Sequence, residues 1–404
     1  MPALSRRAFV RTTSGLLALS AVPSPLRAMP LAAPAPPAGS TASPGAADPE
    51  LTGRPLPDLR RPLPDAPGRR VGIALVGLGA YALNQIAPNL AHTQHARLAA
   101  VVSGNADKAS AVAAAYGLGR EHVYGYDTFD RIADDETVDA VYVILPNAFH
   151  RAWTERAFAA GKHVLCEKPM AGTAEDCRAM IAAGEAAGRR LMIGYRAQFD
   201  PYNRRAIELV QGGEIGTPQI VVADHGRLLE LDVLRDQWRA DKSLALGGSL
   251  YDIGIYSVNG ARYLLGEEPV EVTATFLGRS GRPEVTVEEG VEWQMTFPSG
   301  ARALCSSSYL VDQAKRIHVQ GSRGEVTLDP ATDYYVRNLH VRTSEGRREI
   351  TIPAPNQFAA MLDEMALAVR EDRAPATPGA EGLRDVEILE AIYQAAETGR
   401  AVAV

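Results

Sequence analysis

The sequence predicts an α/β protein with two domains: an N-terminal Rossmann-type doubly wound parallel sheet, and a C-terminal α+β domain with a large, mostly antiparallel open sheet. The length of 404 residues is about two to three times that of a typical domain. From residue 70 to 194, apolar strand-like runs alternate with helix-like segments, as in βαβ units. Beyond residue 194, strand-like segments separated by turn residues predominate, as in an antiparallel sheet.

The composition and the charge exclude several classes of protein. Hydrophobic residues make up 46% of the chain and charged residues 22%, so it is neither disordered nor collagen-like. No apolar run approaches the roughly 18 residues of a membrane span, and we expect no membrane anchor. Residues 71–404 carry 33 basic and 44 acidic side chains, a balance unsuited to a nucleic-acid partner. Cys166, Cys177 and Cys305 have the spacing of neither a disulfide framework nor a zinc site, and we expect no metal.

The first 68 residues are typical of a targeting segment followed by a linker. The pair Arg6-Arg7 precedes a modest apolar stretch at 15–22 and then small residues and prolines, the order of an export signal read by the twin-arginine machinery. We therefore predict a twin-arginine signal peptide over residues 1–33 and a periplasmic location; a basic tail without a signal is the alternative. Fourteen of the 27 prolines lie before residue 71, so residues 34–68 are expected to be a proline-rich arm.

The first folded domain is expected over residues 69–193. Val71–Val76 is a continuous apolar run, as in a strand buried on both faces of a parallel sheet. Further strands are expected at 98–102, 138–145, 164–166 and 191–194, and helices from the first turn to residue 91 and at 107–116, 148–160 and 174–187.

The sequence GLGAYA at residues 77–82 directly follows the first strand. Gly77 permits a tight turn, Gly79 lets the backbone approach a pyrophosphate, and Ala82 lets the helix and the strand pack closely. The N-terminus of the following helix then faces the phosphates. A lone GxGxxA occurs in many unrelated turns, but its place after a buried strand indicates a dinucleotide site.

The end of the second strand indicates which dinucleotide binds. An NAD site carries Asp or Glu there, to accept bonds from both ribose hydroxyls. Here Ser103 and Lys108 supply a hydroxyl and a cation, which suit the 2′-phosphate of NADP better than a carboxylate would. Asp107 is the counter-argument, but it falls where the next helix begins and is explained as a helix N-terminal residue. We predict NADP.

The second domain is expected over residues 194–404. Its helices are expected at 201–211, 250–265, 357–370 and 380–398, and its strands include 218–224, 291–297, 301–307 and 316–320. The segment that contains Trp238 and Arg239 is loop-like.

Three side chains have the chemistry of a redox site. The sequence EKP at residues 167–169 follows a buried strand at the carboxyl edge of the sheet, where open α/β proteins bind ligands. Asp252 and Tyr256 lie four apart, on one face of the helix at 250–265. Oxidising a carbinol requires removal of its hydroxyl proton, which a tyrosinate can accept if the Lys168 ammonium lowers the pKa of Tyr256 from about 10 toward neutrality. Asp252 can orient the lysine or bind a sugar hydroxyl.

Each of these residues also has a structural alternative. Asp252 fits a helix capping box with Ser249, and Tyr256 fits a core residue with a satisfied hydroxyl. Trp238 and Arg239 could likewise be a stack on the surface. Asn147 and His150 could be turn and helix-cap residues.

The glycine turn, the sequence EKP at 167–169 and the segment GSLYDIGIY at 248–256 together resemble the glucose–fructose oxidoreductase/inositol dehydrogenase family, also called the Gfo/Idh/MocA family. The resemblance covers the chain from about residue 53 to its end. The EKP signature is specific for the family in this context. A twin-arginine signal followed by a proline-rich arm is specific for an exported subfamily.

The resemblance implies tightly bound NADP, sugar substrates, and a homo-oligomer, dimer or tetramer, whose arms embrace neighbouring subunits. It assigns catalysis to Lys168, Asp252 and Tyr256, with Tyr256 as the proton acceptor. Together with the glycine turn, it places cofactor contacts at Gly77, Gly79, Tyr81, Ala82, Ser103, Lys108, Leu145, Asn147, His150, Glu167, Lys168, Tyr195, Trp238 and Arg239. The chain departs from close relatives at Ala80, where they carry Lys beside the phosphates.

We therefore predict an exported sugar oxidoreductase that oxidises an aldose to its lactone and reduces a second sugar to an alditol by ping-pong hydride transfer. One alternative is an NADP-dependent aldose or polyol dehydrogenase that exchanges free cofactor. Another is a non-enzymatic NADPH-binding sensor, against which the joint presence of Lys168, Asp252 and Tyr256 argues.

Overall fold

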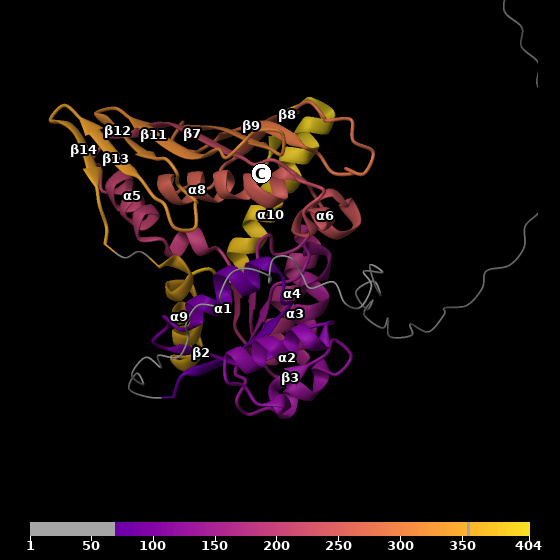
Figure 1. The fold of residues 1–404 in the computed structure, drawn as a ribbon. Helices are drawn as coiled ribbons and strands as arrows, with labels where there is room; N and C mark the ends of the chain where they lie inside the picture. Colours follow the sequence, from indigo (N-terminus) through magenta and orange to yellow (C-terminus); the bar gives the residue numbers. More distant parts are fainter. Residues whose placement is uncertain (1–68, 354–355) are drawn as a thin grey trace, which may run out of the picture. The chain divides into compact units, whose positions relative to one another are not determined.

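The computed structural model describes residues 69–353 and 356–404 (Figure 1). The predicted signal peptide and proline-rich arm lie outside the described residues. Within the described part of the chain, no helix has the length and apolar character needed to cross a membrane. The same residues contain no group of three or more His, Cys, Asp or Glu side chains placed to hold a metal ion.

The first sheet is parallel and has the strand order β3-β2-β1-β4-β5-β6. Its strands are β1 (Val71–Val76), β2 (Ala96–Val102), β3 (Val123–Tyr124), β4 (Ala140–Val143), β5 (His163–Cys166) and β6 (Leu191–Ile193). The chain runs outward from β1 to β3 and then returns to β4 on the other side of β1. The turns after β1 and β4 therefore diverge, and a crevice opens at the carboxyl edge of the sheet.

Helices cover both faces of this sheet, as the doubly wound prediction requires. The helices are α1 (Ala87–Leu90), α2 (Ala106–Ala115), α3 (His150–Ala159), α4 (Ala174–Ala187) and, from late in the chain, α9 (Gln357–Arg370). Helices α3 and α4 bury side chains such as Trp153 against one face. Helices α1, α2 and α9 bury side chains such as Met361 against the other. Short 3₁₀ turns lie at Arg120–His122, Phe129–Asp134, Asn147–Phe149 and Arg196–Phe199.

The second sheet has the strand order β14-β13-β12-β11-β7-β10-β9-β8-β15, and β7 with β10 is its one parallel pair among the described residues. Its strands are β7 (Pro218–Gly226), β8 (Glu271–Phe276), β9 (Gly290–Thr296), β10 (Arg302–Ser308), β11 (Lys315–Gly321), β12 (Gly324–Leu328), β13 (Leu339–Thr343), β14 (Gly346–Ile350) and β15 (Val402–Ala403). Helices α5 (Pro201–Gln211), α8 (Ile255–Leu265) and α10 (Gly379–Thr398) pack against this sheet (Figure 1). The predicted fold class is confirmed.

One local prediction is wrong. Trp238 and Arg239 lie in the short helix α6 (Leu234–Ala240), which is followed by α7 (Lys242–Ala245), and not in a loop. Seven residues without a side-chain cap give no apolar periodicity to read. Buried Asp236 accepts a hydrogen bond from the Arg227 guanidinium and so attaches α6 to the end of β7.

The helix that carries Asp252 and Tyr256 begins as a π-helical turn over Leu250–Gly254 and continues as α8. Ser249 makes no capping bond, and its hydroxyl lies 3.0 Å from the Ser307 hydroxyl instead. The Glu288 carboxylate takes the place of the cap, because it accepts the N–H groups of Gly248 at 2.7 Å and Leu250 at 2.9 Å. The side chain of Asp252 is therefore not part of a capping box.

Candidate active site

A cavity of about 820 Å³ opens at the carboxyl edge of the first sheet, where the strand order reverses. The turns after β1, β2, β4 and β5 line it, together with residues from the end of β7, from α6 and from the π-helical turn before α8. This volume lies in the range of small-molecule and cofactor sites.

The glycine turn has the geometry that a bound pyrophosphate needs. Gly77 has a φ of +95°, and a Cβ there would lie 2.2 Å from the Ile144 carbonyl oxygen, so the position requires glycine. A Cβ on Gly79 would meet no atom within 4 Å, because this residue faces the open cavity. Ala82 begins the π-helical turn Ala82–Ile86 with its side chain fully buried, which fits close packing of helix on strand. The turn therefore fits a dinucleotide.

The end of β2 presents polar groups suited to a phosphate. Ser103 is buried, and its hydroxyl accepts the N–H of Asn105 at 3.1 Å. Asn105 caps α2 by accepting the N–H of Lys108 at 2.9 Å. Asp107 lies in the first turn of α2, the position that the sequence suggested. Ser103 and Lys108 line the cavity, so a hydroxyl, an ammonium and a helix N-terminus surround the place expected for the 2′-phosphate.

Asn147 and His150 line the same cavity and also fasten its walls. The Asn147 side chain donates to the Ala245 carbonyl oxygen at 2.7 Å, which joins the β4 turn to α7. The buried His150 ring lies 2.8 Å from the Pro169 carbonyl oxygen and 2.9 Å from that of Leu145. Burial lowers the pKa of His150, so the neutral ring links the turns after β4 and β5. Leu145 completes this part of the lining.

Glu167 and Lys168 follow β5 and enter the cavity side by side. The buried Glu167 carboxylate accepts a hydrogen bond from the Tyr142 hydroxyl, and burial raises its pKa. The Lys168 ammonium donates to the main-chain oxygen of Asp252 at 2.6 Å and lies 3.9 Å from its carboxylate. Burial lowers the pKa of Lys168, while the Asp252 carboxylate raises it.

Three cations surround the Asp252 carboxylate. Arg239 Nε lies 3.2 Å from Oδ2, an Arg227 nitrogen lies 3.5 Å from the same oxygen, and the Lys168 ammonium lies 3.9 Å from Oδ1. Burial opposes ionisation, but these cations hold the pKa of Asp252 well below its usual value. Asp252 is therefore a permanent anion at neutral pH.

Tyr256 lies one helical turn beyond Asp252 and lines the cavity. The Lys168 ammonium is 4.9 Å from the centroid of its ring, and the Arg196 guanidinium carbon is 5.0 Å from it. Burial raises the pKa of Tyr256, and Arg196 is the strongest influence that lowers it. The net direction is upward, whereas the sequence led us to expect a value lowered by Lys168. Desolvation of the ring is the reason for the difference.

Trp238 and Arg239 of α6 form the stack considered for them, and both also line the cavity. The Arg239 guanidinium carbon lies 4.4 Å from the centroid of the Trp238 ring, which is the stacked arrangement. The same guanidinium pairs with Asp252, and both residues line the cavity.

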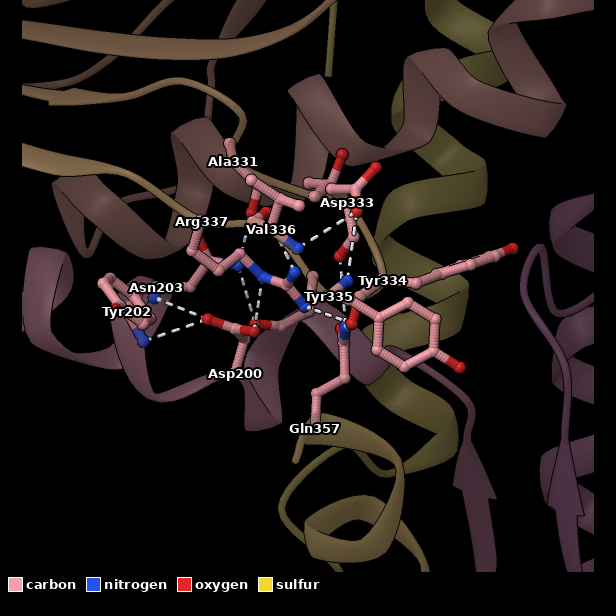
Figure 2. A network of polar contacts seen from close by, with 12 residues as sticks. Asp200, Tyr202, Asn203, Ala331, Asp333, Tyr334, Tyr335, Val336, Arg337 and Gln357 are labelled. Atoms are coloured by element: carbon pink, nitrogen blue, oxygen red, sulfur yellow. Dashed lines mark hydrogen bonds and ion pairs between the residues drawn. The ribbon is translucent and has the colours of Figure 1, made fainter. Parts of the chain in front are cut away.

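A loop between β12 and β13 adds Tyr334 to the cavity wall. Figure 2 shows how this loop is held. Arg337 donates to the Asp200 carboxylate at 2.7 Å, and the Gln357 side chain donates to the main-chain oxygens of Asp333 and Tyr334 at 3.1 and 3.0 Å (Figure 2). The Asp333 carboxylate accepts the N–H of Tyr335 at 3.0 Å. These hydrogen bonds fix the loop and thereby position Tyr334 at the cavity wall.

Two family models match this chain. An oxidoreductase family model with an NAD-binding Rossmann fold matches residues 71–195, and the Gfo/Idh/MocA C-terminal domain matches residues 203–327. The chain belongs to the Gfo/Idh/MocA family. It is thus an oxidoreductase with a domain built to bind NAD(P), as predicted from the glycine turn.

Known members of the Gfo/Idh/MocA family give the comparison its detail. The chain is similar to the D-xylose 1-dehydrogenase [NADP(+)] of Haloarcula marismortui, at 32% identity over 333 residues, which are 81% of this chain and 91% of that protein. It is also similar to the 1,5-anhydro-D-fructose reductase of Ensifer adhaerens, at 28% identity over 75% of this chain and 90% of that one. The crystal structure of aldose-aldose oxidoreductase from Caulobacter crescentus is 47% identical, with a TM-score of 0.80, over 83% of this chain and 100% of that one.

Most of the predicted site residues line the one cavity, and two lie apart from it. Ala82 is buried under the glycine turn. Tyr195 is 2% exposed and packs in the core, and it is not part of the cavity lining. There it is one of the groups that lower the pKa of Asp385 in α10. A cofactor contact at Tyr195 has no support from this position. Because β6 is an outer strand of the sheet, a residue at its end can point away from the crevice.

The sequence analysis did not single out several residues of the lining, and the contacts above bring three of them into the site. These are Arg196, Arg227 and Tyr334. Arg196 follows shortly after β6, and Arg227 directly follows β7. Lys168 was selected because it follows the end of β5, and the same criterion would have selected these two arginines. Tyr334 lies in an irregular loop, and no local pattern marks it.

Proposed function

We propose that this NAD(P)-dependent sugar oxidoreductase holds NADP tightly and couples two sugar reactions in one site: an aldose is oxidised at its anomeric carbon to a lactone, and a second sugar is then reduced to an alditol. The main observation in support is that Lys168, Asp252 and Tyr256 line the same cavity as the glycine turn. The similarity to an aldose-aldose oxidoreductase and to an NADP-dependent xylose dehydrogenase supports the substrate class. In this respect the enzyme is like glucose–fructose oxidoreductase.

The residues that would hold NADP are the glycine turn for the pyrophosphate, and Ser103 and Lys108 for the 2′-phosphate. When bound, the cofactor accepts a hydride from the first sugar and gives it to the second. Glu167, Trp238 and Arg239 line the same cavity, and Arg239 pairs with Asp252 there.

The three catalytic side chains have distinct tasks in this proposal. Tyr256 accepts the hydroxyl proton of the sugar that is oxidised and returns a proton to the sugar that is reduced. Asp252 stays ionised, because its pKa is held well below the usual value, so it orients groups and does not carry the proton. Lys168 is held by Asp252 and offers its remaining N–H groups to a sugar oxygen.

The proposal also includes the location and the assembly of the protein. For these two parts the support comes from the sequence alone. The pair Arg6-Arg7 would direct the folded protein, with its NADP, through the twin-arginine machinery to the periplasm. A compartment without a supply of NADP favours a cycle that regenerates the bound cofactor. A homo-oligomer in which residues 34–68 cover a neighbouring subunit would slow the loss of NADP.

The absorbance spectrum of the purified protein tests this proposal. Nucleotide absorbance should remain after gel filtration, an aldose should raise the absorbance of reduced nicotinamide, and a second sugar should lower it again. A protein purified empty and active only with free NADP would be an ordinary dehydrogenase. A protein that retains NADP but responds to no aldose or ketose would be a sensor.

A further inference from the structure

Arg196 is a buried cation next to the catalytic tyrosine. It begins the 3₁₀ turn Arg196–Phe199 after β6 and is 4% exposed. Its guanidinium donates to the side-chain oxygen of Gln357 at 2.8 Å and to the main-chain oxygen of Thr332 at 2.8 Å. Within residues 69–353 and 356–404, it has no ion pair with a carboxylate. No carboxylate of that part lies within ion-pair distance of it, although its charge lowers the pKa of the nearby Glu167.

A guanidinium buried without a carboxylate is costly, so another group must stabilise it. Two aromatic rings flank it: the guanidinium carbon lies 5.0 Å from the centroid of the Tyr256 ring and 4.6 Å from that of Tyr334. Cation–π attraction supplies part of the stabilisation. Arg196 is also the strongest influence that lowers the pKa of Tyr256. The attraction of a guanidinium for the phenol oxygen strengthens when the phenol becomes an anion.

The other nearby cation is already paired. The Lys168 ammonium faces the Tyr256 ring at 4.9 Å, but it donates to the main-chain oxygen of Asp252 and pairs with its carboxylate. Asp252 itself opposes ionisation of the phenol.

The remaining titratable groups around Tyr256 give no positive charge. Glu167 opposes ionisation of the phenol. The His225 ring stacks on the Tyr256 ring at 5.7 Å, and burial lowers the pKa of His225 to about 3, so this ring is neutral. Burial raises the pKa of Tyr81, and desolvation of the hydroxyl raises that of Tyr334, which is partly exposed, so both phenols are neutral as well. Arg196 is the unpaired positive charge among the described groups that face Tyr256.

We propose that Arg196 is a positioning residue that stabilises the ionised form of Tyr256 and so sets the pH at which the site takes a proton from its substrate. This inference rests on the proposed function, in which Tyr256 is the proton acceptor. Arg196 acts through Tyr256: it holds the ring by the cation–π contact and favours the phenolate by its charge. Without it, burial and the carboxylates of Glu167 and Asp252 would all raise the pKa of the phenol.

The direct test is the ionisation of Tyr256 in the purified holoenzyme. Arg196→Met and Arg196→Lys are each titrated by the ultraviolet absorbance of tyrosinate, and the curve of the same protein carrying Tyr256→Phe is subtracted. Arg205→Met is the matched control, because Arg205 is exposed on α5 and pairs with Glu208. We expect Arg196→Met to raise the midpoint by about 1 to 3 pH units, Arg196→Lys to raise it less, and the control to leave it unchanged.

The pH profile of sugar oxidation gives a second reading. In Arg196→Met the rise of the rate with pH should move upward by the same number of units, about tenfold in rate per unit at a fixed lower pH. An unchanged midpoint in folded Arg196→Met, or a loss of rate that is uniform at every pH, would overturn the proposal.

A further variant keeps the test decisive if Arg196→Met does not fold. Lys168→Met should shift the midpoint of Tyr256 less than Arg196→Lys does, because the Lys168 charge is already paired with Asp252. A larger shift from Lys168→Met would overturn the proposal. The titration needs no turnover, so a failure of the proposed sugar chemistry shows as an inactive wild-type enzyme and leaves this result readable.

Discussion

The buried ion pair between Asp200 and Arg337 holds the loop that carries Tyr334, and breaking it should cost both stability and substrate binding (Figure 2). The Arg337 Nε and the Asp200 oxygen are 2.7 Å apart, and the two side chains are 2% and 0% exposed. The same guanidinium donates to the main-chain oxygens of Val336 and Tyr334 at 3.0 Å each. One side chain thus fixes the loop at three points.

The magnitude follows from this burial. Arg337→Met leaves the Asp200 carboxylate buried without its cation, and removing one partner of a buried pair costs about 3 to 5 kcal/mol. Asp200→Asn keeps a side-chain oxygen to cap α5 at the N–H of Tyr202, so its cost, in the same range, reports the ion pair and not the cap. The double variant leaves no unpaired charge. Its cost should fall short of the summed single costs by about 1 to 3 kcal/mol.

Urea unfolding followed by circular dichroism measures the free energy of unfolding of the wild type, the two single variants and the double variant. Arg342→Met is the control, because Arg342 on β13 is 59% exposed and its solvated pair with Glu325 should contribute little to stability. The KM for sugar should also rise in Arg337→Met, while the NADP content stays the same. Additive single costs, or a cost for Arg337→Met no larger than that of the control, would refute the reasoning.

Three further predictions follow from the cavity. Tyr256→Phe should fold and keep its NADP but lose turnover by at least ~10²-fold; near-normal rates by a steady-state assay would assign the proton to another group. Ser103→Asp combined with Lys108→Ala should shift the bound cofactor from NADP toward NAD, since a carboxylate repels the 2′-phosphate; chromatography of the released nucleotide checks this, and an unchanged content would contradict it. Ala80→Lys should slow the loss of NADP on dialysis by about 10- to 100-fold, through a charge-assisted bond to the phosphates; equal retention in both proteins would count against a phosphate beside Ala80.

The sequence predicted the elements whose signals are local. Val71–Val76 is apolar throughout because both faces of β1 are buried, and the glycine turn after it is set by a φ of +95° at Gly77 that other residues avoid. Asp252 and Tyr256 were predicted from their spacing of four residues on one helix. The helix begins with a π-helical turn at Leu250–Gly254, but both side chains still line the cavity. Each of these patterns lies within a few consecutive residues.

The parts that sequence reasoning missed depend on tertiary contacts. Tyr334 reaches the cavity because Arg337 and Gln357 hold its loop, and no spacing within that loop shows this. The direction of the Tyr256 pKa was also wrong, because it depends on how deeply the ring is buried and on Arg196, which is 60 positions away in the chain. The seven residues of α6 were too few to give a periodic pattern.

The closed cycle is the central claim, and product analysis without added nucleotide tests it most directly. The enzyme is purified, dialysed and incubated with an aldose and a second sugar, and both products are quantified over many turnovers. The account predicts that lactone, or its acid, and alditol form in equal amounts, far in excess of the enzyme, with ping-pong kinetics and no effect of added NADP. Product that stops at one equivalent per site, or that forms only when free NADP(H) is supplied, would contradict it.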